Sequence, residues 1–226
     1  MGRSASQGSR LSRRTRLVVG LALIAAGLTI PVVYLQSQAV SDADQAANQQ
    51  AAAQSVRLED PNVIAVGDNS ESSSADAIPE PTAVAKLSIP RFGSDWKRVV
   101  YEGTSVNKVL TPYGVGHYTK TALPGQVGNF ALAAHRAGSG GPFRNIDKLV
   151  AGDLAIVETA SSRYTYRFLQ SKVVEPSAIG VIAPDPMGLT AMHSSGSLLT
   201  LTTCTPIHVN THRYVAWFEL VSAETL

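Results

Sequence analysis

The sequence predicts a mainly β domain of seven or eight short strands, closed as a barrel or packed as a sandwich, behind an N-terminal apolar helix. Three observations lead to this fold class. An uncharged run fills positions 17–35, and a polar, acidic segment follows it to about residue 84. Short runs of β-forming residues then alternate with turn residues up to residue 226.

The N-terminal helix is expected over residues 17–36, behind a basic tail over residues 1–16 that contains five arginines and no acidic residue. At ~1.5 Å per residue such a helix nearly spans a ~30 Å hydrocarbon core. The next basic residue is Arg57. The positive-inside rule therefore places the tail in the cytoplasm and the rest of the chain outside. We expect a single-pass type II protein of the cell membrane with an extracellular main domain.

A cleaved signal peptide is the alternative, because Ser37 and Ala39 are small residues suited to processing. The apolar run is longer than the ~7 to 15 residues usual in signal peptides. This length favours an uncleaved anchor, and in either case the bulk of the protein is exported.

Residues 37–84 are expected to form a flexible extracellular stalk. Their first half is rich in Ala and Gln and could be helical, but alanine is too small to build a core face. Their second half mixes Ser, Pro, Gly and acids, which is typical of disorder. Residues 37–85 contain eight acidic residues against Arg57 alone, so the segment repels itself and would hold the next domain away from the bilayer.

Residues 85–226 are expected to form the folded domain. Val, Ile, Thr, Tyr and Phe dominate its short runs, which predicts β-strands. The runs begin near residues 86, 98, 129, 152, 163, 197 and 214. Short helices or turns are predicted at 104–110, 143–148 and 186–192. A chain of this size buries about two-thirds of its surface and can fold by itself.

Charge and cysteine content exclude several classes of protein. The net charge is +2 and no Lys/Arg run lies beyond residue 16, so we expect no nucleic-acid partner. The single cysteine, Cys204, excludes an internal disulfide and Cys-cluster metal sites. Cys204, His208 and His212 would line one face of a helix, but Pro206 and the β-forming residues before it argue against a helix there. We therefore expect neither a metal nor another cofactor.

Cys204 is the candidate nucleophile. It ends the alternating run 198–204, and Thr205-Pro206 then stops the strand because proline has no N–H to donate. His135 ends another apolar run, just before a Gly-rich loop. A free thiol is only a few per cent thiolate at neutral pH, so a nearby imidazole would matter for its activation. The alternative for a lone cysteine is a buried, inert thiol.

Arg213 opens the last strand-like run, nine residues after the cysteine. If residues 205–212 form a hairpin loop, positions 204 and 213 lie side by side on paired strands. A guanidinium there would stabilise the oxyanion formed when a thiolate attacks a carbonyl. Alone, Arg213 is also explained as a solvated strand-end charge, and His135 as a structural histidine. The combination with a strand-end cysteine favours catalysis.

These motifs resemble the sortase family of cysteine transpeptidases. The resemblance rests on Thr200-Leu-Thr-Thr-Cys204, on the strand-opening arginine, and on Gly116-His-Tyr118 upstream of the segment 123–136, LPGQVGNFALAAHR. It covers about residues 86–220 and includes the family's order of His, Cys and Arg. It implies an eight-stranded β-barrel, a type II membrane anchor and attachment of secreted proteins to the cell wall of Gram-positive bacteria.

The resemblance also implies a role for each candidate residue. Cys204 would attack the Thr-Gly carbonyl of a C-terminal sorting signal and form a thioester. His135 would protonate the departing amine and later deprotonate the amine of lipid II or another peptidoglycan acceptor. Arg213 would hold the oxyanion and orient the signal peptide, and Thr203 and Tyr118 would contribute to substrate binding.

Within the family, this sequence is most similar to class E sortases. The similarity lies in the residues Gly116-His-Tyr118 and Thr121-Ala-Leu-Pro-Gly125. In that class a tyrosine corresponding to Tyr118 accompanies a preference for Leu-Ala-x-Thr-Gly over Leu-Pro-x-Thr-Gly signals. Tyr118 is otherwise explained as an aromatic residue that packs in the barrel.

Three alternatives to this function stay open. Asp60-Pro61 matches part of the lid motif of pilin-polymerising class C sortases, but Asn62 lacks the aromatic side chain that would fill the active site. The chain is also compatible with an anchored cysteine peptidase that releases its product to water. The third alternative is a catalytically silent β-domain that binds wall components.

Overall fold

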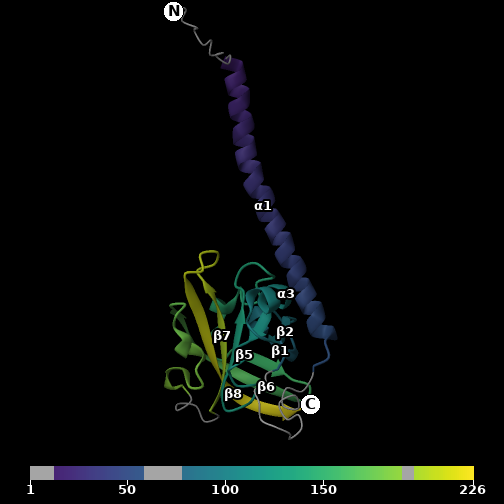
Figure 1. Cartoon of the computed structure of the whole chain (residues 1–226), viewed down its shortest axis with the longest axis vertical. Coiled ribbons are helices and arrows are strands. Elements are labelled where there is room, and N and C mark those ends of the chain that lie inside the picture. The colour runs from purple at the N-terminus through teal and green to yellow at the C-terminus, as the bar shows by residue number, and fades with distance from the viewer. Residues whose placement is uncertain (1–12, 59–77, 190–195) are drawn as a thin grey trace, which may run out of the picture. The chain divides into compact units, whose positions relative to one another are not determined.

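The computed structural model of the chain describes residues 13–58, 78–189 and 196–226 (Figure 1). The chain divides into two compact units, residues 1–40 and residues 41–226. Residues 59–77 of the predicted stalk lie outside the described residues, and with them the Asp60-Pro61 pair compared with a class C lid. Most of the predicted basic tail also lies outside them.

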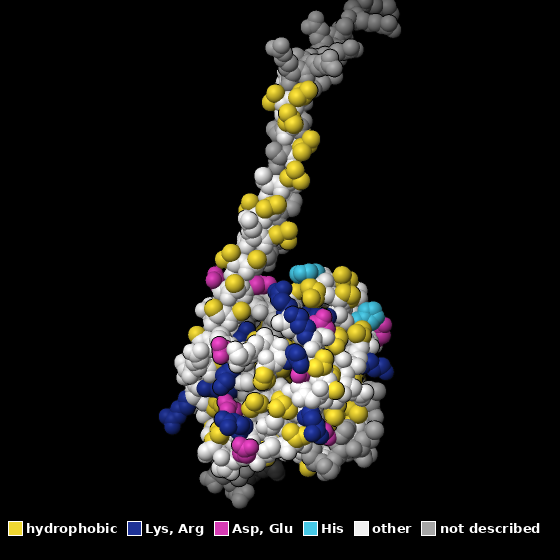
Figure 2. All heavy atoms as spheres, turned by 180° about the vertical axis from the view of Figure 1, so that it is seen from behind, with side chains coloured by type: hydrophobic (Ala, Val, Ile, Leu, Met, Phe, Trp, Pro, Cys, Tyr) yellow, Lys and Arg dark blue, Asp and Glu magenta, His cyan; other side chains and the backbone are white. Residues whose placement is uncertain are grey.

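Helix α1 spans Arg13–Ser55, 43 residues. It covers the predicted apolar helix and continues into the segment predicted as a stalk, where Ala and Gln are good helix formers. Between positions 17 and 35, the nine large apolar side chains whose exposure the structure describes are exposed to between 46% and 66% (yellow along the helix in Figure 2). Among the residues that the structure describes, no helix combines the length and apolarity of a membrane span.

Eight strands close into a barrel (Figure 1). In chain order they are β1 (Ala83–Ser88), β2 (Lys97–Glu102), β3 (Val115–His117), β4 (Gly128–Ala134), β5 (Leu154–Glu158), β6 (Ser162–Val174), β7 (Ser197–Thr205) and β8 (His212–Thr225). Around the barrel they follow the order β1-β2-β3-β4-β7-β8-β6-β5. The pairs β2–β3 and β4–β7 are parallel and the other pairs are antiparallel. The eight-stranded barrel is therefore confirmed, and the sandwich is not formed.

Strand β3 is the one that the strand-like runs did not indicate. It has three residues, Val115–His117, which is too short for an alternating pattern to show. Its middle residue must be glycine, because a Cβ on Gly116 would lie 2.1 Å from the carbonyl oxygen of Gly103. This close approach lets β2 and β3 pair in parallel although only twelve residues separate them in the chain.

The barrel interior is the main hydrophobic core. Its largest fully buried side chains include Tyr166, Phe130, Phe143 and Phe218. A second cluster around Trp217 packs on the outside of the β7–β8 pair, where the indole donates to the carbonyl of Val181 at 3.1 Å. Strand β7 is buried along almost its whole length because one cluster lies on each of its faces.

Short helical turns connect the strands. They are η1 (Pro90–Phe92), η2 (Val106–Leu110), α3 (Thr111–Tyr113), η3 (Ile146–Lys148), η4 (Ile179–Ile182) and η5 (Pro186–Gly188). Three of these confirm the turns predicted at 104–110, 143–148 and 186–192, although residues 190–192 lie outside the described part of the chain. The turns η1, α3 and η4 were not predicted.

Candidate active site

Strand register brings Cys204 and Arg213 together. Strands β7 and β8 are antiparallel, and Cys204 on β7 is the direct pairing partner of Arg213 on β8. The loop between the two strands covers residues 206–211. The hairpin predicted from the nine-residue spacing is therefore confirmed. Residues directly opposite each other on paired strands have Cβ atoms about 4.5–5.5 Å apart, so the two side chains are neighbours.

His135 arrives at the same rim of the barrel from strand β4. Strands β4 and β7 are parallel, and Ala133 pairs with Thr202. Continued by two residues, this register sets His135 beside Cys204. The Thr203 hydroxyl donates to the carbonyl of Ala134 at 2.7 Å and ties the two strand ends together. Three side chains that are far apart in the chain thus gather where β4 and β7 end and β8 begins.

The thiol of Cys204 is free and its residue is half-buried, whereas Thr203 and Thr205 on either side of it are buried. The alternative of a fully buried cysteine is therefore wrong. A rigid strand between two clusters holds the backbone while the side chain remains open to a reactant. This is the environment in which a thiol serves as a nucleophile.

The imidazole of His135 is half-buried and lies 3.3 Å, at Nε2, from the hydroxyl of Thr111. Burial lowers the pKa of His135 below its ordinary value of 6.5, because a buried site disfavours the charged ring. The neutral imidazole therefore predominates at neutral pH. The backbone carbonyl of His135 accepts a hydrogen bond from the Phe143 N–H at 3.1 Å, which fixes the loop that follows.

The guanidinium of Arg213 is held by main-chain oxygens. Its Nη1 donates to the carbonyls of Asn210 at 3.2 Å and His212 at 3.0 Å. No carboxylate pairs with it among the residues that the structure describes. The charge of Arg213 is therefore not neutralised by those residues, and it can stabilise negative charge that develops on a substrate.

Arg136 is a site residue to which the sequence analysis assigned no role. Only 6% of its surface is exposed, and its Nη1 donates to the Thr205 hydroxyl at 2.6 Å. Its Nη2 lies 2.9 Å from Asp147, and its guanidinium stacks 5.5 Å from the ring centre of Tyr214. Arg136 thus joins the ends of β4, β7 and β8. Its place next to His135 in the chain was the available signal.

Comparison with known proteins decides the family. Residues 87–221 match the family model of the Sortase domain. The chain belongs to the sortase family. Sortases are cysteine transpeptidases, which agrees with a strand-end cysteine beside an arginine.

Two of the relatives and three of the structural neighbours of this sortase are named class E sortases, as the motifs indicated. Sortase SrtE2 of Streptomyces coelicolor is 34% identical over 234 residues, covering 99% of this chain and 88% of SrtE2. Sortase SrtE1 of the same organism is 39% identical over 143 residues, 61% of this chain and 40% of SrtE1. The structure of sortase E from Streptomyces avermitilis is 36% identical with a TM-score of 0.56, covering 63% of this chain and 90% of that one. The structure of S. coelicolor sortase E1 with a tripeptide in its active site has the same identity and coverage and a TM-score of 0.57.

Tyr118 lies beside the catalytic strand of the sortase. Its hydroxyl is 3.0 Å from that of Thr202, which in turn donates to the carbonyl of Leu132 at 3.1 Å. The ring packs against a small cluster that includes Val109 and Ala133. Tyr118 is therefore both a packing residue and a half-exposed group, and it contacts β7 at Thr202, two positions before Cys204.

Thr203 has its hydroxyl committed to the backbone of β4, and only 3% of its surface is exposed. This geometry gives it a positioning role between Cys204 and His135. Direct binding of substrate by Thr203 stays a prediction.

The spacing of Cys204, His208 and His212 forms no helical face. Strand β7 continues to Thr205, and His208 lies in the following loop with φ 67°. His212 pairs instead with Glu175 at 3.1 Å. Over residues 13–58, 78–189 and 196–226, no group of three or more His, Cys, Asp or Glu residues is arranged to hold a metal ion.

Proposed function

We propose that this sortase is a membrane-anchored enzyme that cleaves a C-terminal sorting signal, Leu-Ala-x-Thr-Gly or Leu-Pro-x-Thr-Gly, between Thr and Gly. It then joins the secreted protein to the amine of lipid II or another peptidoglycan acceptor. This proposal rests on one observation: Cys204 and Arg213 are pairing partners at the rim of the barrel, and His135 follows the end of β4 at the same rim. The tripeptide in the active site of S. coelicolor sortase E1 supports a peptide substrate.

The first step starts from the fraction of the enzyme in which the Cys204 thiol has given its proton to His135. The Cys204 thiolate attacks the threonine carbonyl carbon, and the C=O electron pair moves to the oxygen. The Arg213 guanidinium stabilises the negative charge on that oxygen. Collapse of the intermediate breaks the C–N bond to glycine, and protonated His135 gives its proton to the departing nitrogen. The product of this step is a thioester between Cys204 and the signal threonine.

In the second step an amine attacks the thioester carbonyl, neutral His135 accepts the amine proton, and the C–S bond breaks. An amide is formed, the thiolate is regenerated and no water is consumed. Because burial lowers the pKa of His135, the neutral base is abundant at neutral pH and is lost only as the pH falls toward that lowered value. The environment of His135 therefore favours the transfer half of the reaction.

The anchor is supported by the first compact unit of the chain. Nine apolar side chains between Leu17 and Leu35 are exposed on α1. Water does not stabilise a helix that is apolar on all sides, whereas lipid does. The arginines at the N-terminal end favour a cytoplasmic N-terminus and an extracellular catalytic domain at the cell membrane.

The proposal is tested with the full chain in detergent micelles and two peptides, one with Leu-Ala-x-Thr-Gly and one with Leu-Pro-x-Thr-Gly. Each peptide is incubated with and without an amine acceptor, and products are identified by mass spectrometry. We expect an acyl-enzyme on Cys204, a new amide when the amine is present, faster turnover of the Ala peptide, and no product from Cys204→Ala. Hydrolysis at the same rate with or without amine would identify a peptidase instead, and the absence of an acyl-enzyme would refute the function.

A further inference from the structure

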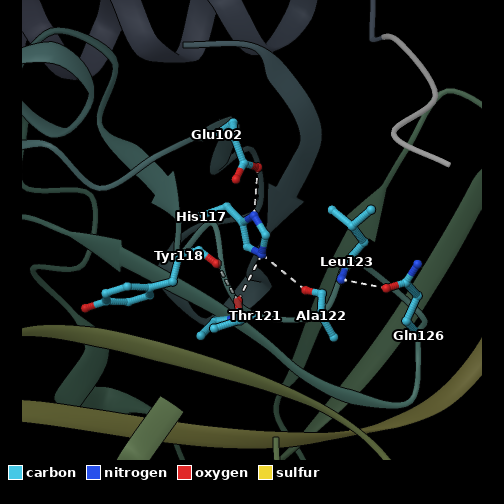
Figure 3. A network of polar contacts seen from close by, with 8 residues as sticks. Glu102, His117, Tyr118, Thr121, Ala122, Leu123 and Gln126 are labelled. Carbon is cyan, nitrogen blue, oxygen red and sulfur yellow. Dashed lines mark hydrogen bonds and ion pairs between the residues drawn. The ribbon is translucent and has the colours of Figure 1, made fainter. Parts of the chain in front are cut away.

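A buried, hydrogen-bonded pair of side chains, Glu102 and His117, lies outside the catalytic rim and takes no part in the reaction described above. The two residues end strands β2 and β3 and are direct pairing partners. His117 Nδ1 lies 2.8 Å from Glu102 Oε2, and their side chains are 2% and 3% exposed. Figure 3 shows the imidazole between Glu102 on one side and Thr121 and Ala122 on the other.

The hydrogen bonds around Thr121 fix the proton on the other side of the ring. The Thr121 hydroxyl donates its proton to the carbonyl of Tyr118 at 2.8 Å and accepts the Ala131 N–H at 3.2 Å. It can therefore only accept from His117 Nε2 at 3.0 Å, and the Ala122 carbonyl, 3.1 Å from the same nitrogen, is also an acceptor. His117 Nε2 thus carries a hydrogen, and one further proton lies between Nδ1 and Glu102.

Because of these proton positions, Glu102 supports the β3–β4 loop indirectly, through His117. The carboxyl group of Glu102 fixes the orientation of the imidazole, and the imidazole then holds two successive residues of the β3–β4 loop through one N–H. Without Glu102, Nδ1 would be a buried nitrogen with no partner, and the imidazole would be held on its Nε2 side alone.

The loop held in this way borders a cavity and carries Tyr118. Thr121 and Ala122 line a cavity of about 310 Å³ together with Asn129 of β4 and Ile182 of η4. At the other end of the same loop, the hydroxyl of Tyr118 reaches Thr202. The segment from Tyr118 to Ala122 therefore extends from the cavity to strand β7, which carries Cys204.

We propose that Glu102 and His117 are positioning residues for peptide recognition: they hold the segment from Tyr118 to Ala122 in the shape against which the substrate peptide binds. This inference rests on the proposed function. The pair acts through the loop and not on the reacting atoms. Its removal should weaken peptide binding while leaving the reactivity of the Cys204 thiol unchanged.

Two substitutions of Glu102 distinguish the effect of its hydrogen bond to His117 from the effect of filling the buried space. In Glu102→Gln the side-chain amide donates to Nδ1 of neutral His117, whose Nε2 keeps its hydrogen, so the loop stays in place. In Glu102→Leu the volume is similar but Nδ1 has no partner. We expect the KM for the sorting-signal peptide within about twofold of the parent in the Gln variant and about tenfold higher in the Leu variant, with kcat within about threefold in both.

Reaction of Cys204 with iodoacetamide is the second measurement, because this small reagent does not need the peptide site. We expect the alkylation rate to be unchanged in both variants. The matched control is Thr159→Val, which removes a buried hydroxyl in the turn between β5 and β6, where it bonds to Ser162. This control should leave both KM and alkylation at the parent values.

Two results would overturn the inference. One is an unchanged KM in Glu102→Leu, and the other is a loss of kcat and alkylation rate as large as the rise in KM. If Glu102→Leu does not fold, Thr121→Val replaces it, since this variant removes one of the two acceptors of the His117 N–H and leaves the buried pair intact. It should raise KM in the same way.

The failure of the proposed function has a different signature. If no sorting-signal peptide acylates the parent enzyme, the effect of Glu102 on His117 and on the loop can still be measured by ¹⁵N NMR of the histidine side chains. The Nε2–H signal of His117 and the amide shifts of residues 118–122 should be kept in Glu102→Gln and lost or displaced in Glu102→Leu. Identical spectra for the two variants would show that the pair does not hold the loop.

Discussion

The proximity of Cys204, His135 and Arg213 is a consequence of strand register. Each residue ends or opens a strand, so neighbouring ladders fix its backbone while its side chain projects at the rim. Arg213 is fixed further by two main-chain carbonyls that accept from the same Nη1. The loop before β8 therefore determines the direction of the remaining N–H donors of the guanidinium.

Arg213→Lys should reduce the acylation rate at least about tenfold, which corresponds to about 1.4 kcal/mol of transition-state stabilisation. Lysine keeps the charge, but a compact ammonium cannot bond the loop carbonyls and the oxyanion with the geometry of a planar fork. Single-turnover formation of the acyl-enzyme measures the effect. Arg163→Lys, at a surface ion pair with Glu158, is the matched control and should acylate normally. A normal acylation rate in Arg213→Lys would show that Arg213 does not stabilise the oxyanion.

The sequence was sufficient to predict that these three residues lie at strand ends, because each one ends or opens a recognisable run of β-forming residues. It was not sufficient for Thr111 or Arg136. The contact of Thr111 with His135 joins a helical turn to a strand end 24 residues away, and the contact of Arg136 with Thr205 joins residues 69 apart. Such contacts depend on how the barrel closes, which no local pattern encodes.

At the scale of elements, the C-terminal part of α1 belongs to the same compact unit as the barrel. Gln50 Oε1 accepts from the Arg98 guanidinium at 2.8 Å and from the Lys97 N–H at 2.9 Å. Arg98 is 6% exposed, and desolvation lowers its pKa to about 10. The guanidinium also stacks on Trp96, at 5.0 Å from the ring centre. A stretch of Ala and Gln without an apolar face is thus held by polar contacts.

Gln50→Ala should lower the free energy of unfolding of residues 41–226 by about 1–3 kcal/mol, because it leaves a buried guanidinium without one of its acceptors. Gln54→Ala is the matched control. Gln54 lies one turn along the same helix and is exposed, so its replacement should change the stability by less than about 0.5 kcal/mol. Urea denaturation followed by circular dichroism compares the two. Equal stabilities would mean that this part of α1 does not support the barrel.

The predicted elements succeeded where local composition decides them and failed where tertiary contacts do. Alternating runs of β-branched and aromatic residues located seven strands. Strand β3 forms because Gly116 allows the backbone of Gly103 to approach, which is a property of two segments and not of one. The continuation of α1 to Ser55 similarly depends on partners such as Arg98 and Lys97 that lie far along the chain.

At the scale of the whole molecule, the sequence determined the division into an N-terminal helix and a β domain but not the closure of the sheet. The choice between barrel and sandwich depends on the pairing of β1 with β5, which joins segments about 70 residues apart. The parallel pairing of β4 with β7 joins segments equally far apart and brings His135 to the rim beside Cys204. Closure therefore creates the active site.

The anchoring proposal concerns the whole chain. We expect the full chain to stay in the membrane fraction after alkaline carbonate washing and to be released only by detergent. A variant without residues 1–36 should appear in the soluble fraction and cleave the sorting-signal peptide at a rate within about twofold of the parent. The reason is that a continuous stretch with nine exposed large apolar side chains lies between residues 17 and 35, whereas the barrel and its active site lie within residues 41–226.

A second variant separates lipid binding from simple adhesion. Leu21→Lys combined with Leu28→Lys places two charges within the apolar stretch at a cost of about 2.5–3.5 kcal/mol each at the centre of a bilayer. Exchange of the same two leucines for isoleucine is the matched control and should leave the chain in the membrane. If the lysine variant resists carbonate extraction as well as the control does, lipid does not surround this helix and the anchor must be sought elsewhere.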